Sequence, residues 1–449
     1  MPATASLAHY VASAKAADLP AWTLHEAQRT LLNLLGVSLS ASVMPAGRIM
    51  LEWAAGEAAA PRASVIGSEL RTSPATAALL NGYLAHLQDY DDTHFPTVLH
   101  PSAPVWPAVL AAAEDIGASG RDACAAFVLG AETACRVAMS VHPWHYDAGW
   151  HITGTAGVFG AVAGAGRLLG LSAEQMTHAL GTAGTQAGGV REVFGSDGKA
   201  MHPAKAASNG LQAAQLAKEG FTSADDVLGG RRGFWAVLSA GGHSEEQLLG
   251  GLGERWELAQ NGIKPYANGV VSHPIQDAVI RLRNEHGLRA EDVTAIHARV
   301  HPLVLELMDR PKPRRGLEGK FSFQHCAAAA LVDGAGHDAQ FSDERIADPT
   351  VAAVRALVSA TLDGSMGEDQ AHVTISLVDG RTVEARTEHA TGSPGNPMAD
   401  EALEAKYRAV ATPVIGEERA EKLIAAVWAL DGAPGVGAVA SLMTTSSAA

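Results

Sequence analysis

Acidic and basic side chains gather in one short stretch of the chain, residues 86–102, with the sequence HLQDYDDTHFPTVLHPS. It contains three histidines and three aspartates. Imidazole and carboxylate groups are common general acids and bases, and histidine is the side chain that titrates closest to neutral pH. The stretch is therefore the first candidate for a site that moves protons.

A helix running through this stretch would place three of its polar side chains on one face. His86, Asp89 and Thr93 stand at positions i, i+3 and i+7, while the two remaining aspartates would point elsewhere. We expect the helix to end near residues 95–96, where a proline follows, and a loop to fold back with His100. One segment would then present a carboxylate, a hydroxyl and an imidazole together.

Two other interpretations fit the same residues. The aspartates can belong to a solvated helix end, with the histidines as ordinary surface groups. Histidine and aspartate at helical spacing can also ligate zinc or iron. The chain offers no second cluster of matching quality to complete such a ligand set, so we expect no metal.

A second group of polar residues, HYDAGWHITGTAG, precedes a run of small residues and contains Tyr146 and His151. The glycines that follow could suggest a nucleotide-binding loop. However, no Gly-Lys-Ser/Thr triplet follows them, and no strand is expected before them. Close packing of a helix against its neighbours is the better explanation of these glycines.

Two further segments place cations near predicted helix starts. Lys199 and His202 lie in GKAMHPAKAA, and Lys264 and Tyr266 lie in IKPYANGVVSHP. A helix N-terminus and a nearby ammonium group both favour a bound anion such as a carboxylate, although lysines at a helix start are often simply solvated. His325, in KFSFQHCAAAA, is a polar residue on an otherwise apolar helix, which by itself indicates a core histidine with satisfied hydrogen bonds.

Composition excludes several classes of function. The chain has 449 residues, is 47% hydrophobic and 18% charged, and has a formal net charge of -15 without any long basic run. A nucleic-acid-binding surface is therefore not expected, and an anionic ligand would need local cations to attract it. The three cysteines lie in apolar contexts typical of a reducing compartment. With no visible secretory signal and no apolar run suited to a membrane, we expect a cytoplasmic protein.

The spacing of apolar residues predicts a mainly α fold. Helical periodicity dominates up to about residue 260, and Ser172 with Gln175 forms a capping-box pattern at one helix start. A segment with strand-like alternation follows, in which the Asp379-Gly380 pair suits a hairpin turn and residues 348–362 look helical. Helical character then returns near the C-terminus. We therefore expect a discontinuous all-helical domain, formed by residues 1–260 and 394–449, with an α+β domain of residues 261–393 inserted into it.

Five segments in this order resemble the MmgE/PrpD family, which includes 2-methylcitrate dehydratase, cis-aconitate decarboxylase and iminodisuccinate epimerase. They are NGYLAHLQDYDDTH, HYDAGWHITGTAGVFGA, GKAMHPAKAASNGLQAAQLAKEGFT, IKPYANGVVSH and GLEGKFSFQHCAAAALVDG. The resemblance covers nearly the whole chain. It implies a helical domain built from both chain ends, an inserted lid-like domain, a homodimer and chemistry that needs no cofactor.

The resemblance also implies a set of active-site residues. In catalysis, His100 and His151 would transfer protons, Asp89 would orient an imidazole or accept a substrate hydroxyl, Thr93 would hydrogen bond, and His325 would stand where the family often has tyrosine. Lys199 and Lys264 would bind substrate carboxylates. Apart from this resemblance, the positions of His202, Tyr146 and Tyr266 in the same motifs predict further contacts to the substrate.

These features predict a lyase of the dehydratase type acting on a small hydroxy-polycarboxylic acid, similar to citrate or 2-methylcitrate. The alternatives are an epimerase or a decarboxylase of a related dicarboxylate or tricarboxylate, such as iminodisuccinate or cis-aconitate, and a relative that binds carboxylates without catalysis. The family's activities share one requirement, a proton added to or removed from a carbon beside a carboxylate. We expect no partner other than this small substrate and a second copy of the chain.

Overall fold

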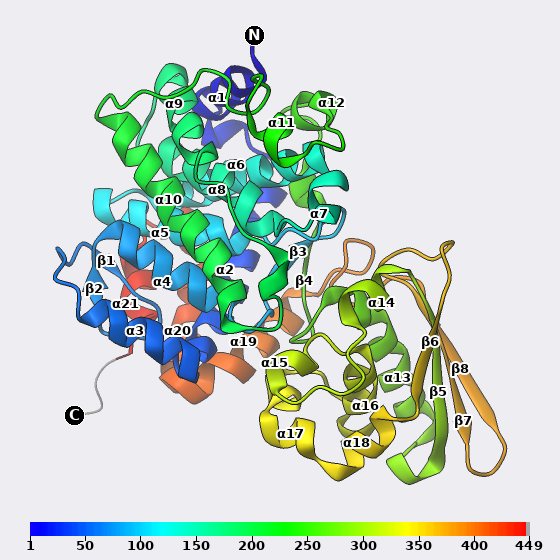
Figure 1. Ribbon diagram of the computed structural model, residues 1–449. Coiled ribbons are helices and arrows are strands. Elements are labelled where there is room, and N and C mark those ends of the chain that lie inside the picture. The colour runs from blue at the N-terminus through cyan, green and yellow to red at the C-terminus, as the bar shows by residue number, and fades with distance from the viewer. Residues whose placement is uncertain (446–449) are drawn as a thin grey trace. The chain divides into compact units, whose positions relative to one another are not determined.

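The structure, a computed structural model, describes residues 1–445 and divides the chain into two compact units (Figure 1). The helical unit consists of Met1–Leu87, Asp91–Asn261 and the chain from Ala399 onward. The α+β unit consists of Gly262–Met398 together with the three residues Gln88–Tyr90. The prediction of a mainly α fold with a small sheet is confirmed.

Helices of six or more residues make up most of the helical unit. They are α1 (Ala3–Ser13), α2 (Ala21–Ser42), α3 (Pro45–Ala55), α4 (Pro74–His86), α5 (Ser102–Ile116), α6 (Gly120–Val141), α8 (Ile152–Leu168), α9 (Ala173–Gly184), α10 (Met201–Lys218), α19 (Asp400–Ile415), α20 (Glu417–Trp428) and α21 (Gly437–Leu442). The shorter elements are α7 (Trp144–Asp147), α11 (Phe234–Leu238), α12 (Glu245–Leu249), β1 (Ala63–Ser64), β2 (Arg71–Thr72) and β3 (Asp92–His94). The chain leaves this unit in β4 (Asn261–Ile263).

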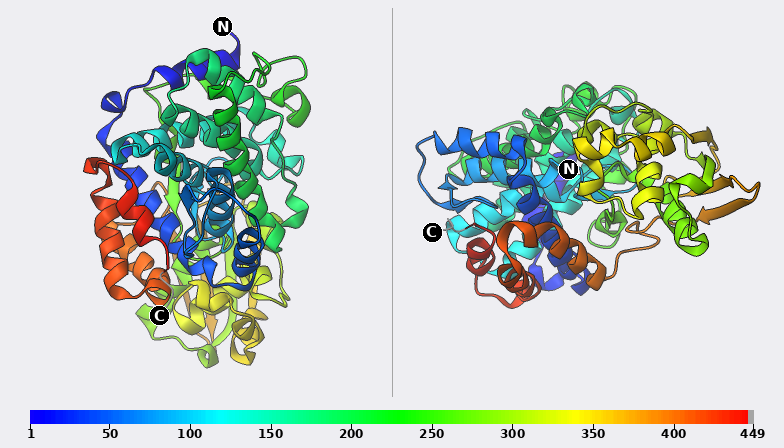
Figure 2. Two further views of the ribbon diagram at one scale, coloured as in Figure 1. Left: turned by 90° about the vertical axis from the view of Figure 1, so that its left-hand side faces the viewer. Right: turned by 90° about the horizontal axis from the view of Figure 1, so that it is seen from below.

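Helix α8 is the core of the helical unit and packs against α5, α6, α9 and α10 (Figure 1). A Cβ atom built on either Gly130 of α6 or Gly160 of α8 would lie 2.7 Å from the carbonyl oxygen of the other. The two backbones therefore meet without side chains between them, as predicted for the glycines after His151. The C-terminal helix α19 packs on α2, so both ends of the chain complete the same unit (Figure 2).

Helix α6 is long and apolar enough to cross a membrane by composition alone. However, 94% of its most apolar window is buried by the rest of the structure. A bent pair formed by α2 and α3 also meets the composition test, with an angle of 85° at the break. Such burial is typical of a core helix, so α6 needs no membrane to explain its composition.

The α+β unit contains a four-stranded sheet with the order β6-β5-β7-β8. Its strands are β5 (Val293–Val300), β6 (Val358–Leu362), β7 (Ala371–Leu377) and β8 (Thr382–Thr387), and its helices are α13 (His273–His286), α14 (Leu303–Met308), α15 (Gly316–Gly319), α16 (Phe323–Asp333), α17 (Asp343–Ala347) and α18 (Pro349–Arg355). Alternate residues of β7 are buried, and α13 packs on β7 and β8. The predicted hairpin at Asp379-Gly380 is confirmed by the antiparallel pairing of β7 with β8.

Two sequence predictions of helices were wrong. Residues 348–362 are not one helix, because α18 ends at Arg355 and the chain then pairs in parallel with β5 as strand β6. The helix through residues 86–95 also does not exist, because α4 ends at His86 and β3 follows. Asp89 has a left-handed φ of 53°, which a helix does not allow.

Lysine side chains of the α+β unit explain why the helix ends there. Lys320 Nζ donates to the carbonyl oxygen of Gln88 at 2.7 Å, and Lys264 Nζ donates to that of Asp89 at 2.9 Å. A helix would need the same carbonyl oxygens for its own hydrogen bonds. The lysines therefore stabilise the turn through residues 88–90 in place of the helix.

Candidate active site

The buried carboxylate of Asp91 joins two histidines of the helical unit. Its Oδ2 atom lies 2.7 Å from Nδ1 of His86, the last residue of α4, and its Oδ1 atom lies 3.4 Å from Nδ1 of His100. The Asp91 and His86 side chains have no exposed surface, and that of His100 is 8% exposed. Opposite charge or hydrogen bonding to a carboxylate holds a neighbouring imidazole in one orientation.

The backbone of β3 also holds His100. Its Nδ1 atom lies 2.7 Å from the carbonyl oxygen of Asp92 and 3.3 Å from Oγ1 of Thr93. A carbonyl oxygen only accepts, so Nδ1 of His100 carries the proton and Nε2 of the neutral ring carries the lone pair. This tautomer suits His100 to act as a base through Nε2.

His151 brings a third imidazole to the same place from the start of α8. Its ring centroid lies 5.6 Å from that of His86 and 6.5 Å from that of His100, and its side chain is buried. Its Nδ1 atom is 2.8 Å from Nδ1 of His202, in the first turn of α10. We call His86, His100 and His151 the histidine cluster.

Lys199 supplies the positive charge beside the histidine cluster. It lies in a short 3-10 turn directly before α10 and is buried, with its ammonium group 5.1 Å from the centre of the Phe194 ring. The same Phe194 ring meets His151 edge-on at a centroid distance of 4.9 Å. The predicted carboxylate-binding lysine and the predicted proton-transfer histidines of this unit therefore converge.

Burial and neighbouring charges favour the neutral forms of His86 and His151. Loss of hydration lowers the pKa of His86 to about 4, in spite of Asp91 beside it. Burial, followed by Lys199 and the surrounding histidines, lowers the pKa of His151 well below its usual range. Burial opposes ionisation of Asp91, but His100 and His86 outweigh this effect and hold the pKa of Asp91 well below its usual range. At neutral pH the site therefore combines the anionic carboxylate of Asp91 with neutral imidazoles at His86 and His151.

The histidine cluster also has the geometry of a metal site, since one nitrogen of each imidazole lies within 4.8 Å of the others. In addition, Nε2 of His86 is buried and has no hydrogen-bond partner among the described residues. The ammonium group of Lys199 is close enough to lower the pKa of both His86 and His151, and it opposes a divalent cation in the same way. The absence of a metal stays a prediction.

The α+β unit contains the other part of the predicted site. Lys264 is 2% exposed and pairs with the Asp89 carboxylate at 3.1 Å, in addition to its bond to the Asp89 carbonyl oxygen. Tyr90, beside Asp89, donates its hydroxyl to the carbonyl oxygen of Pro265 at 2.8 Å. The structure thus pairs the predicted acid–base carboxylate with the predicted substrate-binding lysine.

Two predicted site residues of this unit are committed to internal contacts. Nε2 of His325 lies 2.9 Å from the carbonyl oxygen of Gln340, and its Nδ1 lies 3.3 Å from Arg355, which donates. Because both ring nitrogens have partners within the protein, these contacts favour the interpretation of His325 as a core histidine, and its catalytic role stays a prediction. The hydroxyl of Tyr266 donates to Asp277 at 2.6 Å, and burial and this carboxylate raise its pKa.

Tyr146 lies on the short helix α7 and is buried. The Arg191 guanidinium lies 4.0 Å from the centre of the Tyr146 ring and donates to the Tyr146 carbonyl oxygen at 3.0 Å. The preceding His145 anchors α7, with Nδ1 2.7 Å from the carbonyl oxygen of Leu238 and Nε2 2.7 Å from Oγ1 of Thr155. These contacts support the segment that leads into His151.

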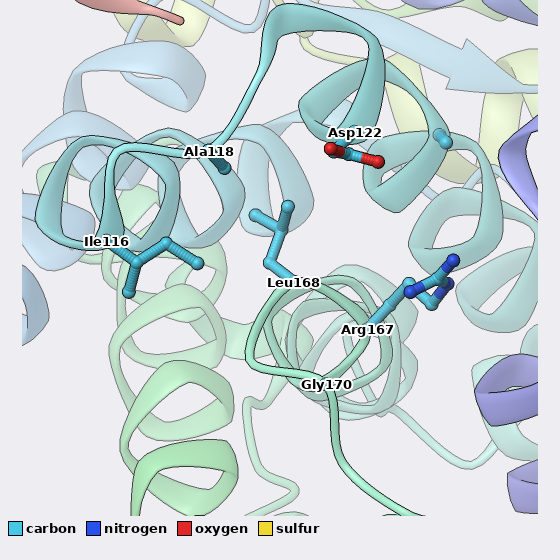
Figure 3. Close-up of a pocket in the computed structure, with 7 residues that line it drawn as sticks. Ile116, Ala118, Asp122, Arg167, Leu168 and Gly170 are labelled. Carbon is cyan, nitrogen blue, oxygen red and sulfur yellow. The ribbon is translucent and has the colours of Figure 1, made fainter.

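A separate pocket of about 280 Å³ lies at the ends of helices α5, α6 and α8 (Figure 3). It is lined by Ile116, Ala118, Asp122, Ala125, Arg167, Leu168 and Gly170. Arg167 donates to the carbonyl oxygen of Ala14, and Asp122 accepts from Ser119 in the cap of α6. This pocket shares no residue with the histidine cluster, and its charged groups already serve the helix ends.

Sequence reasoning missed His86 and Asp91 as members of the site. The helical projection directed Asp91 away from its neighbours, whereas the observed turn and strand bring it between two imidazoles. The usable signal was the density of titratable groups within residues 86–102, which marked the right segment. Which residues of this segment belong to the candidate site depends on the turn and strand that follow His86.

Comparison with known proteins decides the relationship. Residues 5–247 match the MmgE/PrpD N-terminal domain and residues 266–431 match the MmgE/PrpD C-terminal domain. The chain belongs to the MmgE/PrpD family. The resemblance predicted from its motifs is therefore confirmed.

Several curated MmgE/PrpD relatives carry the name cis-aconitate decarboxylase. The human protein is 27% identical over 95% of this chain and 92% of its own length. The Aspergillus terreus protein is 27% identical over 95% of this chain and 93% of its own length. A cis-aconitate decarboxylase-like protein of Aspergillus oryzae is 27% identical over 98% and 97%, respectively.

The Asp91 carboxylate should contribute measurably to the stability of the helical unit. We expect Asp91→Asn to lower the free energy of unfolding by about 1.5–3 kcal/mol, because hydrogen bonds to a buried ionised acceptor are lost. Urea unfolding followed by circular dichroism measures this difference. Asp147→Asn, at an exposed position of α7, is the matched control and should change stability by no more than about 0.5 kcal/mol. Equal losses in the two variants would contradict the assignment.

His145 should make stability depend on pH in a defined direction. Burial lowers the pKa of His145 to about 4, whereas its value in the unfolded chain is about 6.5. Between these two pH values the imidazole is protonated in the unfolded state and neutral in the folded state. The stability that neutral His145 contributes is therefore present above about pH 6.5 and is lost as the pH falls toward 4. His145→Gln removes the titration. Between pH 7 and pH 5 the stability difference between wild type and variant should shift by about 2 kcal/mol in favour of the variant. If the difference in unfolding free energy between wild type and His145→Gln is the same at pH 7 and pH 5, the prediction is wrong.

Proposed function

We propose that this chain is a lyase that transfers a proton at a carbon beside a carboxylate in a small polycarboxylic acid. The observation that carries the proposal is the convergence of three buried imidazoles with the ammonium group of Lys199 in the helical unit. Neutral imidazoles at neutral pH can take up a proton, and the resulting imidazolium can return it. One site thus contains both a base and its conjugate acid.

The charge distribution supports an anionic substrate. The whole chain carries a formal charge of -15, which repels a polycarboxylate at long range. The buried ammonium group of Lys199 is a local positive charge beside His86 and His151. Binding of a carboxylate to Lys199 would also stabilise negative charge that develops on the adjacent carbon.

Cis-aconitate is the first substrate to test, because the similar proteins of human and Aspergillus terreus carry its name. In a decarboxylation, the bond to one carboxylate breaks and releases CO₂. The electron pair stays on carbon and takes a proton from an imidazole N–H of the histidine cluster, and a proton from water replaces it. His100 and His151 are the proposed proton carriers, and Lys199 is the proposed carboxylate ligand.

Dehydration of a citrate-like hydroxy acid is the second candidate. There a base removes the proton beside the carboxylate, the C–O bond breaks, and an acid protonates the leaving hydroxyl to give water. The histidine cluster supplies two imidazoles that can divide these tasks, because their tautomers are fixed by different partners. An epimerase would use the same first step and return the proton to the opposite face.

NMR in heavy water distinguishes these reactions on the intact protein. Each of four acids is incubated with the chain: cis-aconitate, citrate, 2-methylcitrate and iminodisuccinate. Decarboxylation releases CO₂ and places one deuterium in the product, dehydration forms an alkene, and epimerisation exchanges deuterium without net loss. Binding of these acids without exchange or product would instead indicate a non-catalytic relative.

The role of Lys199 is tested by substitution. Lys199→Ala should lower kcat/KM by about a hundredfold or more, because it removes the charge that holds the carboxylate. Lys205→Ala, at an exposed position of α10, is the control and should retain wild-type turnover. Full activity of Lys199→Ala on the true substrate would show that this lysine is not a substrate ligand.

The homodimer also stays a prediction, implied by the family. Light scattering of the full chain should then give a mass near twice the single-chain value of 46.4 kDa. A mass near the single-chain value at micromolar concentration would contradict it. The cytoplasmic location stays a prediction in the same way.

A further inference from the structure

Two histidines of the helical unit contact each other directly through their ring nitrogens. Nδ1 of His151 lies 2.8 Å from Nδ1 of His202, with the ring centroids 5.0 Å apart. A hydrogen bond of this kind needs a proton on one nitrogen and a lone pair on the other. The tautomers of the two imidazoles are therefore coupled: when Nδ1 of one ring carries a proton, Nδ1 of the other carries a lone pair.

The backbone holds this pair in place. The His151 amide donates to the carbonyl oxygen of Gly189 at 3.0 Å. A Cβ atom on Gly189, whose φ is +131°, would lie 2.9 Å from Cγ of His202. A Cβ atom on Gly154 would lie 2.9 Å from Cβ of His202. Both glycines leave room for this side chain, so its ring has a defined position against His151.

The two histidines differ in their access to water. His151 is 2% exposed and lies among His86, His100 and Lys199, whereas His202 is only half-buried. His86 offers no comparable route for a proton to reach water, because its side chain is fully buried and its Nδ1 is bound to Asp91. His202 is thus the member of this group through which a proton can reach solvent.

We propose that His202 is a positioning and relay residue that switches His151 from base to acid by exchanging a proton across the Nδ1–Nδ1 contact. The inference rests on the proposed function. Before the reaction, His151 carries its proton on Nδ1 and donates it to His202, which leaves Nε2 of His151 as the base. When Nε2 accepts a proton from substrate, the Nδ1 proton passes to His202.

The proton taken from the substrate is balanced by one that His202 releases to water. His202, which carried its own proton on Nε2, becomes an imidazolium and releases that proton to water. His151 is left neutral, with its proton on Nε2 and its Nδ1 accepting from His202. When it donates the Nε2 proton to a leaving hydroxyl or to a carbanion, His202 returns its Nδ1 proton to Nδ1 of His151 and takes up a proton from water on Nε2. The reverse sequence recharges His151 when the reaction consumes a proton, as decarboxylation does.

Nitrogen NMR of the full chain labelled with ¹⁵N-histidine tests the contact without any substrate. Wild type should show a through-hydrogen-bond coupling between two Nδ1 atoms, and His202→Phe should abolish it. His178→Asn, which replaces another half-buried histidine of this unit, should leave the coupling intact. Absence of the coupling in wild type overturns the proposal.

Turnover tests the relay itself, with cis-aconitate as the first probe and the other three acids after it. His202→Asn retains a hydrogen-bonding amide near the Nδ1 position but cannot pass a proton. Its kcat should fall about 10- to 100-fold with KM within about twofold, and the solvent deuterium isotope effect on kcat should rise. Imidazole added to His202→Ala should restore part of kcat, which a purely structural role would not allow.

The outcomes separate the relay from the proposed function. If wild type converts none of the four acids, the proposed function fails in its present form and the NMR measurement alone decides whether the histidine pair exists. If wild type is active and His202→Asn keeps its kcat, the relay is wrong while the proposed function stands. His178→Asn should match wild type in every kinetic measurement.

Discussion

A carboxylate without access to water sets the geometry of the helical unit's site. Asp91 is ionised because two imidazoles face it, and each imidazole has its Nδ1 directed toward that carboxylate or the neighbouring backbone. The lone pairs on Nε2 of His86 and His100 follow from this arrangement, since each neutral ring has only one proton to place. The Asp91 charge and the Asp92 carbonyl oxygen together therefore leave Nε2 as the reactive atom of His86 and of His100.

Close helix packing allows these groups to be buried. Helix α8 begins directly after His151 and runs through the core, where Gly160 meets Gly130 of α6 and Gly210 of α10 meets Ala161. Small residues let three helix backbones approach, so the cluster lies beside a rigid frame and not on an independent loop. Rigid supports favour catalytic geometry, because a small displacement of a reacting group costs much of its rate enhancement.

Periodicity and local motifs predicted much of the fold. Apolar spacing identified most of the long helices, the capping box of Ser172 with Gln175 marked the start of α9, and the Asp379-Gly380 pair marked a hairpin. These features depend on neighbouring residues, which a sequence displays directly. The strand β6 and the turn after His86 depend on distant partners, namely β5 for the strand and two lysines for the turn, so local spacing could not reveal them.

The motifs located the candidate site more reliably than the projection onto a helix did. His100, His151, Lys199 and His202 gather in one unit although three separate segments supply them. Asp91 was excluded only because the wrong local geometry was assumed for its segment. His325 shows the opposite case, where family position suggested chemistry and the observed partners of both ring nitrogens suggest a core role.

Because Gln88–Tyr90 belong to the α+β unit while the residues on either side belong to the helical unit, the chain passes between the units four times and not twice. An excised fragment of residues 262–398 would lack these three residues. Lys264 and Lys320, 2% and 3% exposed, would then lose the carbonyl and carboxylate oxygens that the segment gives them. Although it contains its own sheet and helices, the inserted module is therefore not a self-sufficient piece that can be cut out at its two obvious ends.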